Sequence, residues 1–223
     1  MPELLPPQLV VNCRMMFLSY LPAEPEAIDA ALPAEFGLAP VGSRAVVLVH
    51  YVVDRDDQTS GFGAYSLSYI CFDVVGHDAD AETPGRWFSH YFISSPRVRD
   101  YAIERGIPAT DGVTTLEFEG DTLVATATVD GKPLIRSRAR TTGEVGEITG
   151  GQLMVLSALD GRVMRNRHAV IMERARDFEM QSISFLDPDH PIHPFRPREP
   201  LDLVFGFHAP RASFCYPGGI EAG

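Results

Sequence analysis

Residues 113–141 read VTTLEFEGDTLVATATVDGKPLIRSRART, and this stretch decides the fold class. Three runs rich in Val, Thr, Leu, Ile and Phe are separated by Gly120-Asp121 and Asp130-Gly131. Such residues favour strands, and Asp-Gly favours the positive φ angles of a two-residue hairpin turn. The stretch therefore predicts three consecutive antiparallel strands at 113–119, 122–129 and 134–141.

The same pattern extends in both directions along the chain. Short apolar runs that end at Gly, Asp or Pro predict further strands at 14–21, 45–53, 64–75, 86–93, 152–159, 168–178 and 201–212. Successive hairpins of this kind favour a β-sandwich or a β-barrel.

Two short helices are expected between the strands. The first spans 24–32 and starts around Pro25; the second is capped by Ser95, has Pro96 in its first turn and ends at Gly106. Helices this short are not stable alone in water, so they must pack on the sheet. The chain is therefore predicted to be α+β and mainly antiparallel β.

A single domain over 1–223 is expected, with loose ends at 1–8 and 218–223. Apolar residues make up 45% of the chain, and no linker rich in Pro, Gly or Ser divides it. The segment 187–200, DPDHPIHPFRPREP, is too rich in proline for a helix or a central strand. It is predicted to be an ordered loop or an edge covering.

The net charge, the N-terminal residues and the cysteines indicate which partners and which cellular location to expect. The formal net charge of −11 disfavours nucleic acid and anionic membrane surfaces as partners. The N-terminal residues lack a basic start followed by a long apolar run, so a cytoplasmic protein is expected. Cys13, Cys71 and Cys215 are far apart and predict neither a disulfide framework nor a zinc knuckle.

Lys132 is the single lysine of the chain, and it limits the chemistry. A primary amine is the side chain that condenses with a ketone to a Schiff base. Lys132 follows the Asp130-Gly131 turn, where a solvated side chain is expected. The sequence thus predicts that no Schiff base forms.

Several polar residues interrupt apolar strands and are candidates for a site. His50 and His90 are each either a core histidine with a satisfied hydrogen bond or a proton-transfer group in a pocket. His90 is favoured because Trp87 and Tyr91, among its aromatic neighbours, could wall an apolar cavity. Arg14 opens an apolar strand, either as a strand-end residue in water or as an anion-binding group.

His190 and His193 raise the alternative of a metal site. Asp187 and Asp189 lie close in sequence, but the prolines between them stiffen the segment and no third ligand is identifiable. A surface loop is the preferred interpretation, and no metal or cofactor is predicted.

An ordered series of motifs is similar to the acetoacetate decarboxylase superfamily. Its most specific part is Thr59-Ser60-Gly61-Phe62-Gly63-Ala64-Tyr65-Ser66, which resembles the TSGxGxY stretch of that family. Before it lie Arg14 and the helix up to Pro33 at the family's spacing, and after it lie residues 121–128 and, near the end, Ala209-Pro210-Arg211-Ala212. The resemblance implies a cone-shaped antiparallel β-barrel flanked by helices, with an enclosed apolar pocket for a small carbonyl compound.

The resemblance also implies losses at the site. The Pro-Lys-Lys element that supplies the Schiff-base lysine in the decarboxylase corresponds to Pro108-Ala109-Thr110. Leu67 and about Val52 stand where pocket glutamates are expected, whereas Arg14 matches the arginine that points into the pocket. We therefore predict that the protein does not decarboxylate acetoacetate at an appreciable rate.

Two functions remain open from the sequence. The first is a lyase-type enzyme that decarboxylates, dehydrates, cleaves or cyclises a keto acid or polyketide-like compound without a Schiff base. Arg14, His90 and Tyr91 would then be catalytic, and the substrate-binding residues would be Tyr65, Leu67, Trp87, Ala109, Thr110 and His50. The second is a binding protein for an apolar or carbonyl metabolite. Exposed strand edges further suggest a homo-oligomer, and a purely structural subunit is a third, weaker possibility.

Overall fold

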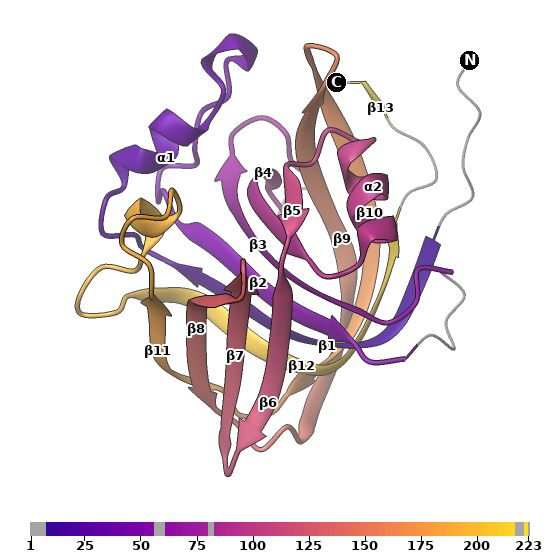
Figure 1. Ribbon diagram of the computed structural model, residues 1–223, viewed down its shortest axis with the longest axis vertical. Helices are drawn as coiled ribbons and strands as arrows, with labels where there is room; N and C mark the ends of the chain where they lie inside the picture. The colour runs from indigo at the N-terminus through magenta and orange to yellow at the C-terminus, as the bar shows by residue number, and fades with distance from the viewer. Residues whose placement is uncertain (1–7, 56–60, 80–82, 217–220, 223) are drawn as a thin grey trace.

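The computed structural model describes residues 8–55, 61–79, 83–216 and 221–222. Its main feature is a barrel, in which the strands follow the order β12-β1-β2-β3-β4-β9-β10 and β10 pairs again with β12 (Figure 1). Neighbouring strands are antiparallel except for β4 and β9, which run parallel. The barrel strands are β1 Gln8–Tyr20, β2 Val46–Val53, β3 Tyr65–Val74, β4 Gly85–Ile93, β9 Val145–Leu159, β10 Arg162–Ala175 and β12 Leu203–Tyr216.

A second, smaller sheet packs against the outside of this barrel. It has the strand order β11-β8-β7-β6, and Figure 1 shows it crossing in front of β1 and β2. Its strands are β6 Val113–Glu119, β7 Thr122–Val129, β8 Lys132–Arg140 and β11 Glu179–Phe185. The short strands β5 Ala109–Asp111 and β13 Glu221–Ala222 pair with β4 and β10.

The barrel wall therefore has apolar side chains on both faces. Alternate residues of β1 and β2 point inward, where they join an inner cluster that includes Phe17, Val49 and Tyr51. The intervening residues point outward and pack with the second sheet in an outer cluster that includes Leu18 and Leu48. This double burial explains why β1 and β2 read as nearly continuous apolar runs.

The helices lie at the edges of these two clusters. Helix α1, Glu26–Ala31, buries Ile28 in the outer cluster, and the 3₁₀ helix η1, Ala34–Phe36, follows it. Helix α2, Pro96–Ile103, buries Val98 and Ala102 in the inner cluster. The 3₁₀ helix η2 is His193–Phe195. No helix in the described ranges is long and apolar enough to span a membrane.

The predicted fold class is confirmed. The strands at 113–119 and 122–129 match β6 and β7 to the residue. At the turn between β7 and β8, Asp130 and Gly131 have the expected positive φ angles of 51° and 74°. Ser95 caps α2 by accepting a hydrogen bond from the Val98 N–H at 3.4 Å, as predicted.

Other boundaries differ from the prediction. Strand β11 was not predicted, and β9, β10 and β12 extend well beyond the expected ranges. Of the ends predicted to be loose, Gln8 already belongs to β1, whereas 1–7, 218–220 and 223 lie outside the described residues. The proline-rich segment is an ordered loop, as expected, because Ile192 and Phe195 are buried in the outer cluster.

Gly106 attaches the end of α2 to the barrel, and it gives a stability prediction. Its φ is +70°, and an added Cβ would lie 1.9 Å from the backbone oxygen of Ala158 in β9. We expect Gly106→Ala to lower the free energy of unfolding by about 3 kcal/mol, because both the backbone and its neighbour must shift. Urea denaturation measures this difference.

Gly161 is the matched control for this substitution. It has a φ of +72°, but an added Cβ would meet nothing within 4 Å. Gly161→Ala should therefore lower stability by only about 1 kcal/mol, from the left-handed conformation alone. Equal losses in the two variants would contradict the close packing of α2 on β9.

Candidate active site

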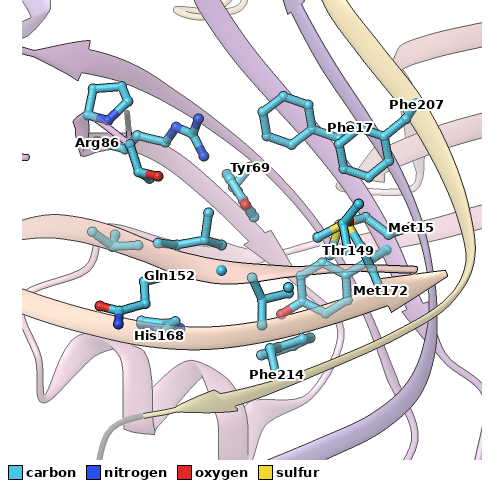
Figure 2. Close-up of a pocket in the computed structure, with 18 of the residues that line it drawn as sticks. Met15, Phe17, Tyr69, Arg86, Thr149, Gln152, His168, Met172, Phe207 and Phe214 are labelled. Carbon is cyan, nitrogen blue, oxygen red and sulfur yellow. The ribbon is translucent and has the colours of Figure 1, made fainter. Parts of the chain in front are cut away.

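The inner face of the barrel encloses a cavity of about 270 Å³. It lies between β1, β2, β3, β4, β9, β10 and β12, and much of its wall is aromatic or aliphatic (Figure 2). Apolar lining residues include Met15, Phe17, Phe88, Met172, Phe207 and Phe214. A pocket of this kind, with a few placed polar groups, suits a small organic ligand.

Arg86 is the polar group best placed to bind an anion in the cavity. Its Nε donates to Asp73 Oδ1 at 2.9 Å, a pairing that the β3–β4 register positions. Neither Nη nitrogen makes a hydrogen bond to a described residue, so this end of the guanidinium remains available. Burial opposes the charge, but Asp73 and other neighbours raise the pKa of Arg86 above its ordinary value. Arg86 is therefore a fixed cation whose two Nη amino groups are unpaired within the described part of the chain.

The charge of the lining is opposite to that of the whole chain. Arg86 and Arg174 both line the cavity, and no carboxylate belongs to the described lining residues. Asp73 and Glu147 each pair with one of these arginines. Although the chain has a net charge of −11, the cavity therefore has a positive local potential, which attracts anionic ligands.

Tyr69 lies next to Arg86 and supplies a neutral donor. Figure 2 shows its hydroxyl directed into the cavity, and that hydroxyl makes no hydrogen bond within the described part of the chain. Its ring stacks on Tyr91 with a centroid distance of 6.0 Å. Burial raises the pKa of Tyr69, so the phenol stays protonated and can donate to a carbonyl or enolate oxygen.

Further tyrosines form a cluster around the Tyr216 hydroxyl. This oxygen lies 2.6 Å from Tyr51 Oη, 3.2 Å from Tyr65 Oη and 3.4 Å from Tyr91 Oη. Burial raises the pKa of all four phenols, which keeps the cluster neutral. Because Tyr51, Tyr91 and Tyr216 also line the cavity, they form a rigid, hydrogen-bonding part of its wall.

His168 is the titratable base of the cavity. It projects from β10, and its ring packs edge-on to Tyr216 at 5.4 Å. Burial, and next the charge of Arg105, lower the pKa of His168 to about 4. The imidazole is therefore neutral at pH 7 and can accept a proton from a bound substrate.

Four of the predicted site residues meet at this part of the molecule. Tyr65, Leu67, Tyr91 and Ala109 are all buried in the inner cluster, and β5 places Ala109 directly beside Tyr91. Tyr91 lines the cavity itself, whereas the other three lie behind the lining residues. In the matched motif, Thr59 and Ser60 lie outside the described residues.

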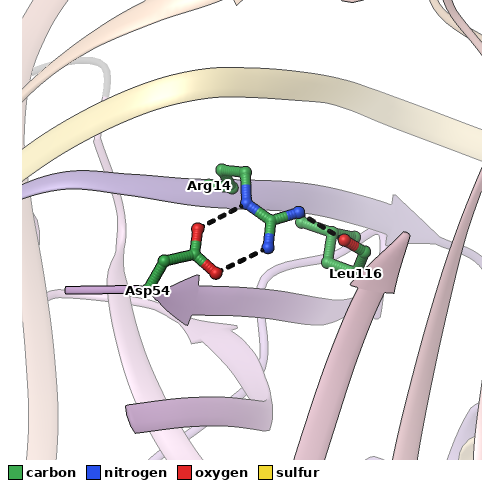
Figure 3. A network of polar contacts seen from close by, with 3 residues as sticks. All are labelled: Arg14, Asp54 and Leu116. Carbon is green, nitrogen blue, oxygen red and sulfur yellow. Dashed lines mark hydrogen bonds and ion pairs between the residues drawn. The ribbon is translucent and has the colours of Figure 1, made fainter. Parts of the chain in front are cut away.

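Arg14 does not lie where the sequence placed it. It shares the outer face of β1 with Met16 and Leu18, so it points away from the cavity. Its Nε and Nη2 bind the two Asp54 carboxylate oxygens at 2.7 and 2.8 Å, and its Nη1 donates to the Leu116 carbonyl (Figure 3). Asp54 raises the pKa of Arg14 by this hydrogen bonding. The guanidinium therefore links β1 to the second sheet. Arg14 does not line the cavity, contrary to the prediction from the sequence.

His50 is also on the outer face of the wall. It is fully buried, with Nδ1 2.7 Å from Ser68 Oγ and Nε2 3.0 Å from Ser137 Oγ. Burial lowers its pKa to about 3. Of the two interpretations made from the sequence, the structure supports a core histidine with satisfied hydrogen bonds. His50 does not line the cavity, which corrects its predicted contact with substrate.

A β-bulge explains the position of His90, whereas Trp87 precedes the bulge and points outward by the regular alternation of β4. Phe88 pairs with Cys71 and His90 pairs with Ile70, so Ser89 is an extra residue in β4. The bulge turns His90 to the outer face, where its ring lies 6.4 Å from that of His190. Trp87 packs in the same outer cluster. Neither lines the cavity, and the same bulge turns Tyr91 inward.

Thr110 and Lys132 lie away from the cavity. Thr110 is exposed on β5 next to the buried Ala109, so its predicted substrate contact is also misplaced. Lys132 is exposed at the start of β8 in the second sheet, as the turn predicted. No other lysine exists in the chain.

The sequence analysis missed Arg86, Tyr69, His168 and Tyr216. A usable signal existed for Arg86, which opens an apolar strand exactly as Arg14 does and faces Asp73 across the preceding hairpin. Tyr216 could not be assigned, because the last strand was expected to end at 212. For His168, one histidine among the polar residues of β10 carries no distinguishing pattern.

Comparisons with known proteins agree with this architecture. No protein-family model matches the sequence, and no curated protein sequence matches it. Solved structures match over nearly the whole chain. An acetoacetate decarboxylase superposes with a TM-score of 0.73 at 16% identity, covering 100% of this chain and 92% of that one.

Two further structures give the same result. Acetoacetate decarboxylase from Legionella pneumophila has a TM-score of 0.70 at 13% identity, covering 100% of this chain and 92% of its own. The enduracididine biosynthesis enzyme MppR, in complex with pyruvate, has a TM-score of 0.65 at 13% identity, covering 99% and 91%. The chain thus has the acetoacetate decarboxylase-like fold, as its motifs predicted.

Proposed function

We propose that the protein is a small-molecule enzyme that acts on a keto acid or a related carbonyl compound in the barrel cavity, without a Schiff base. The observation that supports this most directly is Arg86, whose Nη groups face an apolar cavity beside the Tyr69 hydroxyl and, like that hydroxyl, bond to no residue that the structure describes. A lyase-type reaction, such as decarboxylation, dehydration or retro-aldol cleavage, fits this donor set.

The proposed roles follow from the chemistry of each group. Arg86 binds the substrate carboxylate with a charge-assisted, two-point contact. Tyr69 donates to the adjacent carbonyl oxygen and stabilises the enolate that forms there. Neutral His168 accepts or returns the proton, and the apolar walls exclude water from the reacting atoms.

The absence of a Schiff base gives a direct test. We expect that borohydride with a panel of keto acids forms no covalent adduct, and that Lys132→Arg keeps the wild-type kcat/KM. Lys132 is exposed in the second sheet, so no ketone bound in the cavity can reach its amine. Mass spectrometry of the intact protein reads the first result and steady-state kinetics the second.

The outcome that contradicts this proposal is equally specific. A reduced adduct on Lys132, or a large loss of turnover in Lys132→Arg, would mean that the amine takes part. The control is a lysine-dependent aldolase treated with borohydride and its own ketone substrate, which must show an adduct under the same conditions.

A binding protein is the second candidate, and the composition of the wall favours it. Aromatic and aliphatic residues dominate the lining, and the Tyr51, Tyr91 and Tyr216 hydroxyls already bond to one another. Keto compounds that bind tightly with no product in single-turnover assays would support this function over catalysis.

A further inference from the structure

Arg174 is the second guanidinium of the cavity, and one of its donors has no acceptor. Its Nη1 lies 2.8 Å from Glu147 Oε1, whereas its Nε is buried and has no hydrogen-bond partner within the described ranges. A buried donor without an acceptor is unfavourable, and a charged one especially so. The side chain is nevertheless 25% exposed and lines the cavity, and its Nη2 makes no hydrogen bond to a described residue, so an additional acceptor can reach the guanidinium at Nη2.

An aromatic stack separates Arg174 from Arg86. The Phe17 and Phe207 rings are nearly parallel, at 4° and with a centroid distance of 5.2 Å. The guanidinium of Arg86 lies 5.2 Å from the Phe17 centroid, and that of Arg174 lies 4.8 Å from the Phe207 centroid. Each cation is thus held over its own ring by a cation–π contact, with apolar surface between the two.

Arg174 also connects the cavity to a second hollow. This groove of about 390 Å³ shares Arg174 and Phe207 with the cavity and is lined further by Glu147 and Arg176. Arg176 is exposed and forms no ion pair with a described carboxylate. The groove therefore carries two arginines against one glutamate, and its junction with the cavity attracts anions.

We propose that the substrate carries two anionic groups, of which Arg86 binds one and Arg174 binds the other. The apolar segment between them lies along Phe17 and Phe207. This inference rests on the proposed function and narrows its substrate class to keto acids with a second carboxylate or an equivalent anion. A keto monocarboxylate satisfies Arg86 but leaves the Arg174 Nη2 without an acceptor among the described residues.

Matched pairs of ligands test this inference. The probes are 2-oxo monocarboxylates and 2-oxo dicarboxylates of equal chain length, taken through a series of lengths and measured by isothermal titration calorimetry. At the best length we expect the wild type to bind the dicarboxylate about tenfold more tightly or better. Arg174→Gln should remove this preference while weakening monocarboxylate binding much less than dicarboxylate binding, whereas Arg86→Gln should weaken both.

Two further variants show whether a change in affinity reflects the anion site or a general loss of folding. Glu147→Gln removes the carboxylate that competes for Arg174, so it should tighten dicarboxylate binding a few-fold, a gain that misfolding cannot produce. Arg211→Gln breaks the exposed Arg211–Glu173 pair on the outer side of β10 and β12 and should leave both affinities unchanged.

The possible results separate this inference from the proposed function. Arg86-dependent binding of monocarboxylates with no dicarboxylate preference at any length would overturn the two-anion substrate and leave the keto acid function standing. Equal weakening of both ligands by Arg174→Gln, with no gain in Glu147→Gln, would overturn it as well. Failure of every oxo acid to bind would overturn both.

Discussion

Arg86→Gln is expected to lower kcat/KM for any carboxylate substrate by at least about a hundredfold. The substitution removes a charged, two-point contact inside an apolar cavity, where such contacts contribute more than in water. A loss of this size corresponds to about 2.7 kcal/mol of transition-state binding. Steady-state kinetics with the best keto acid substrate measures it, and calorimetry measures the accompanying rise in Kd.

The Arg86 substitution needs controls because Asp73 loses its partner. Arg86→Lys keeps the charge but not the planar fork, so we expect partial rescue of binding. Arg14→Gln breaks a comparable arginine–aspartate pair on the other face of the wall and should leave Kd within about twofold. A larger loss in Arg14→Gln than in Arg86→Gln would restore the pocket assignment made from sequence.

Arg14 and Arg86 show which features of the site could be predicted from the sequence and which could not. Both open an apolar strand, and the strand pattern places both correctly in the barrel wall. What the pattern cannot give is the face, because apolar packing on both sides of β1 removes the usual alternation of polar and apolar residues. The sequence therefore predicted site residues on β1 to β5, some of them on the face that points away from the cavity, and none on β9, β10 or β12.

The bulge in β4 is a second limit of the same kind. With regular alternation, His90 would share the face of Phe88 and line the cavity, as the sequence suggested. One extra residue, Ser89, reverses this parity for the rest of the strand. Nothing in the run RWFSHYFI marks the position of a bulge. The turns were predictable because Asp-Gly has a local backbone preference, whereas the parity of β4 depends on pairing with β3.

We expect the protein to unfold in mild acid, between about pH 5 and pH 4, because several buried histidines must be protonated. Burial lowers the pKa of His50 to about 3 and those of His168 and His208 to about 4, whereas the ordinary value is 6.5. The unfolded chain therefore binds more protons than the folded chain between about pH 6.5 and pH 4. Stability is fully present above pH 6.5 and falls as the pH is lowered through this window.

The size of this effect is large relative to typical stabilities. At pH 5 each of these three histidines removes on the order of 2 kcal/mol, or about 6 kcal/mol together. Domains are commonly stable by about 5–15 kcal/mol, so most of the native state should be lost between pH 5 and pH 4. Urea denaturation at a series of pH values, followed by circular dichroism, gives the slope directly.

His50 allows this slope to be assigned to a particular residue. In the wild type a proton on His50 must be accommodated between Ser68 and Ser137, which are themselves fully buried. His50→Gln keeps hydrogen-bonding groups at this position but has no proton to gain, so it should be less stable than the wild type at pH 7. The variant should nevertheless lose less stability between pH 7 and pH 5, by about 2 kcal/mol. Carboxylates contribute little to this difference, because their ordinary pKa values near 4 place most of their titration below pH 5. An equal pH dependence in His50→Gln and the wild type would mean that the fold leaves the pKa of His50 at its ordinary value, and its assignment as a buried, neutral link between the barrel and the second sheet would have to be abandoned.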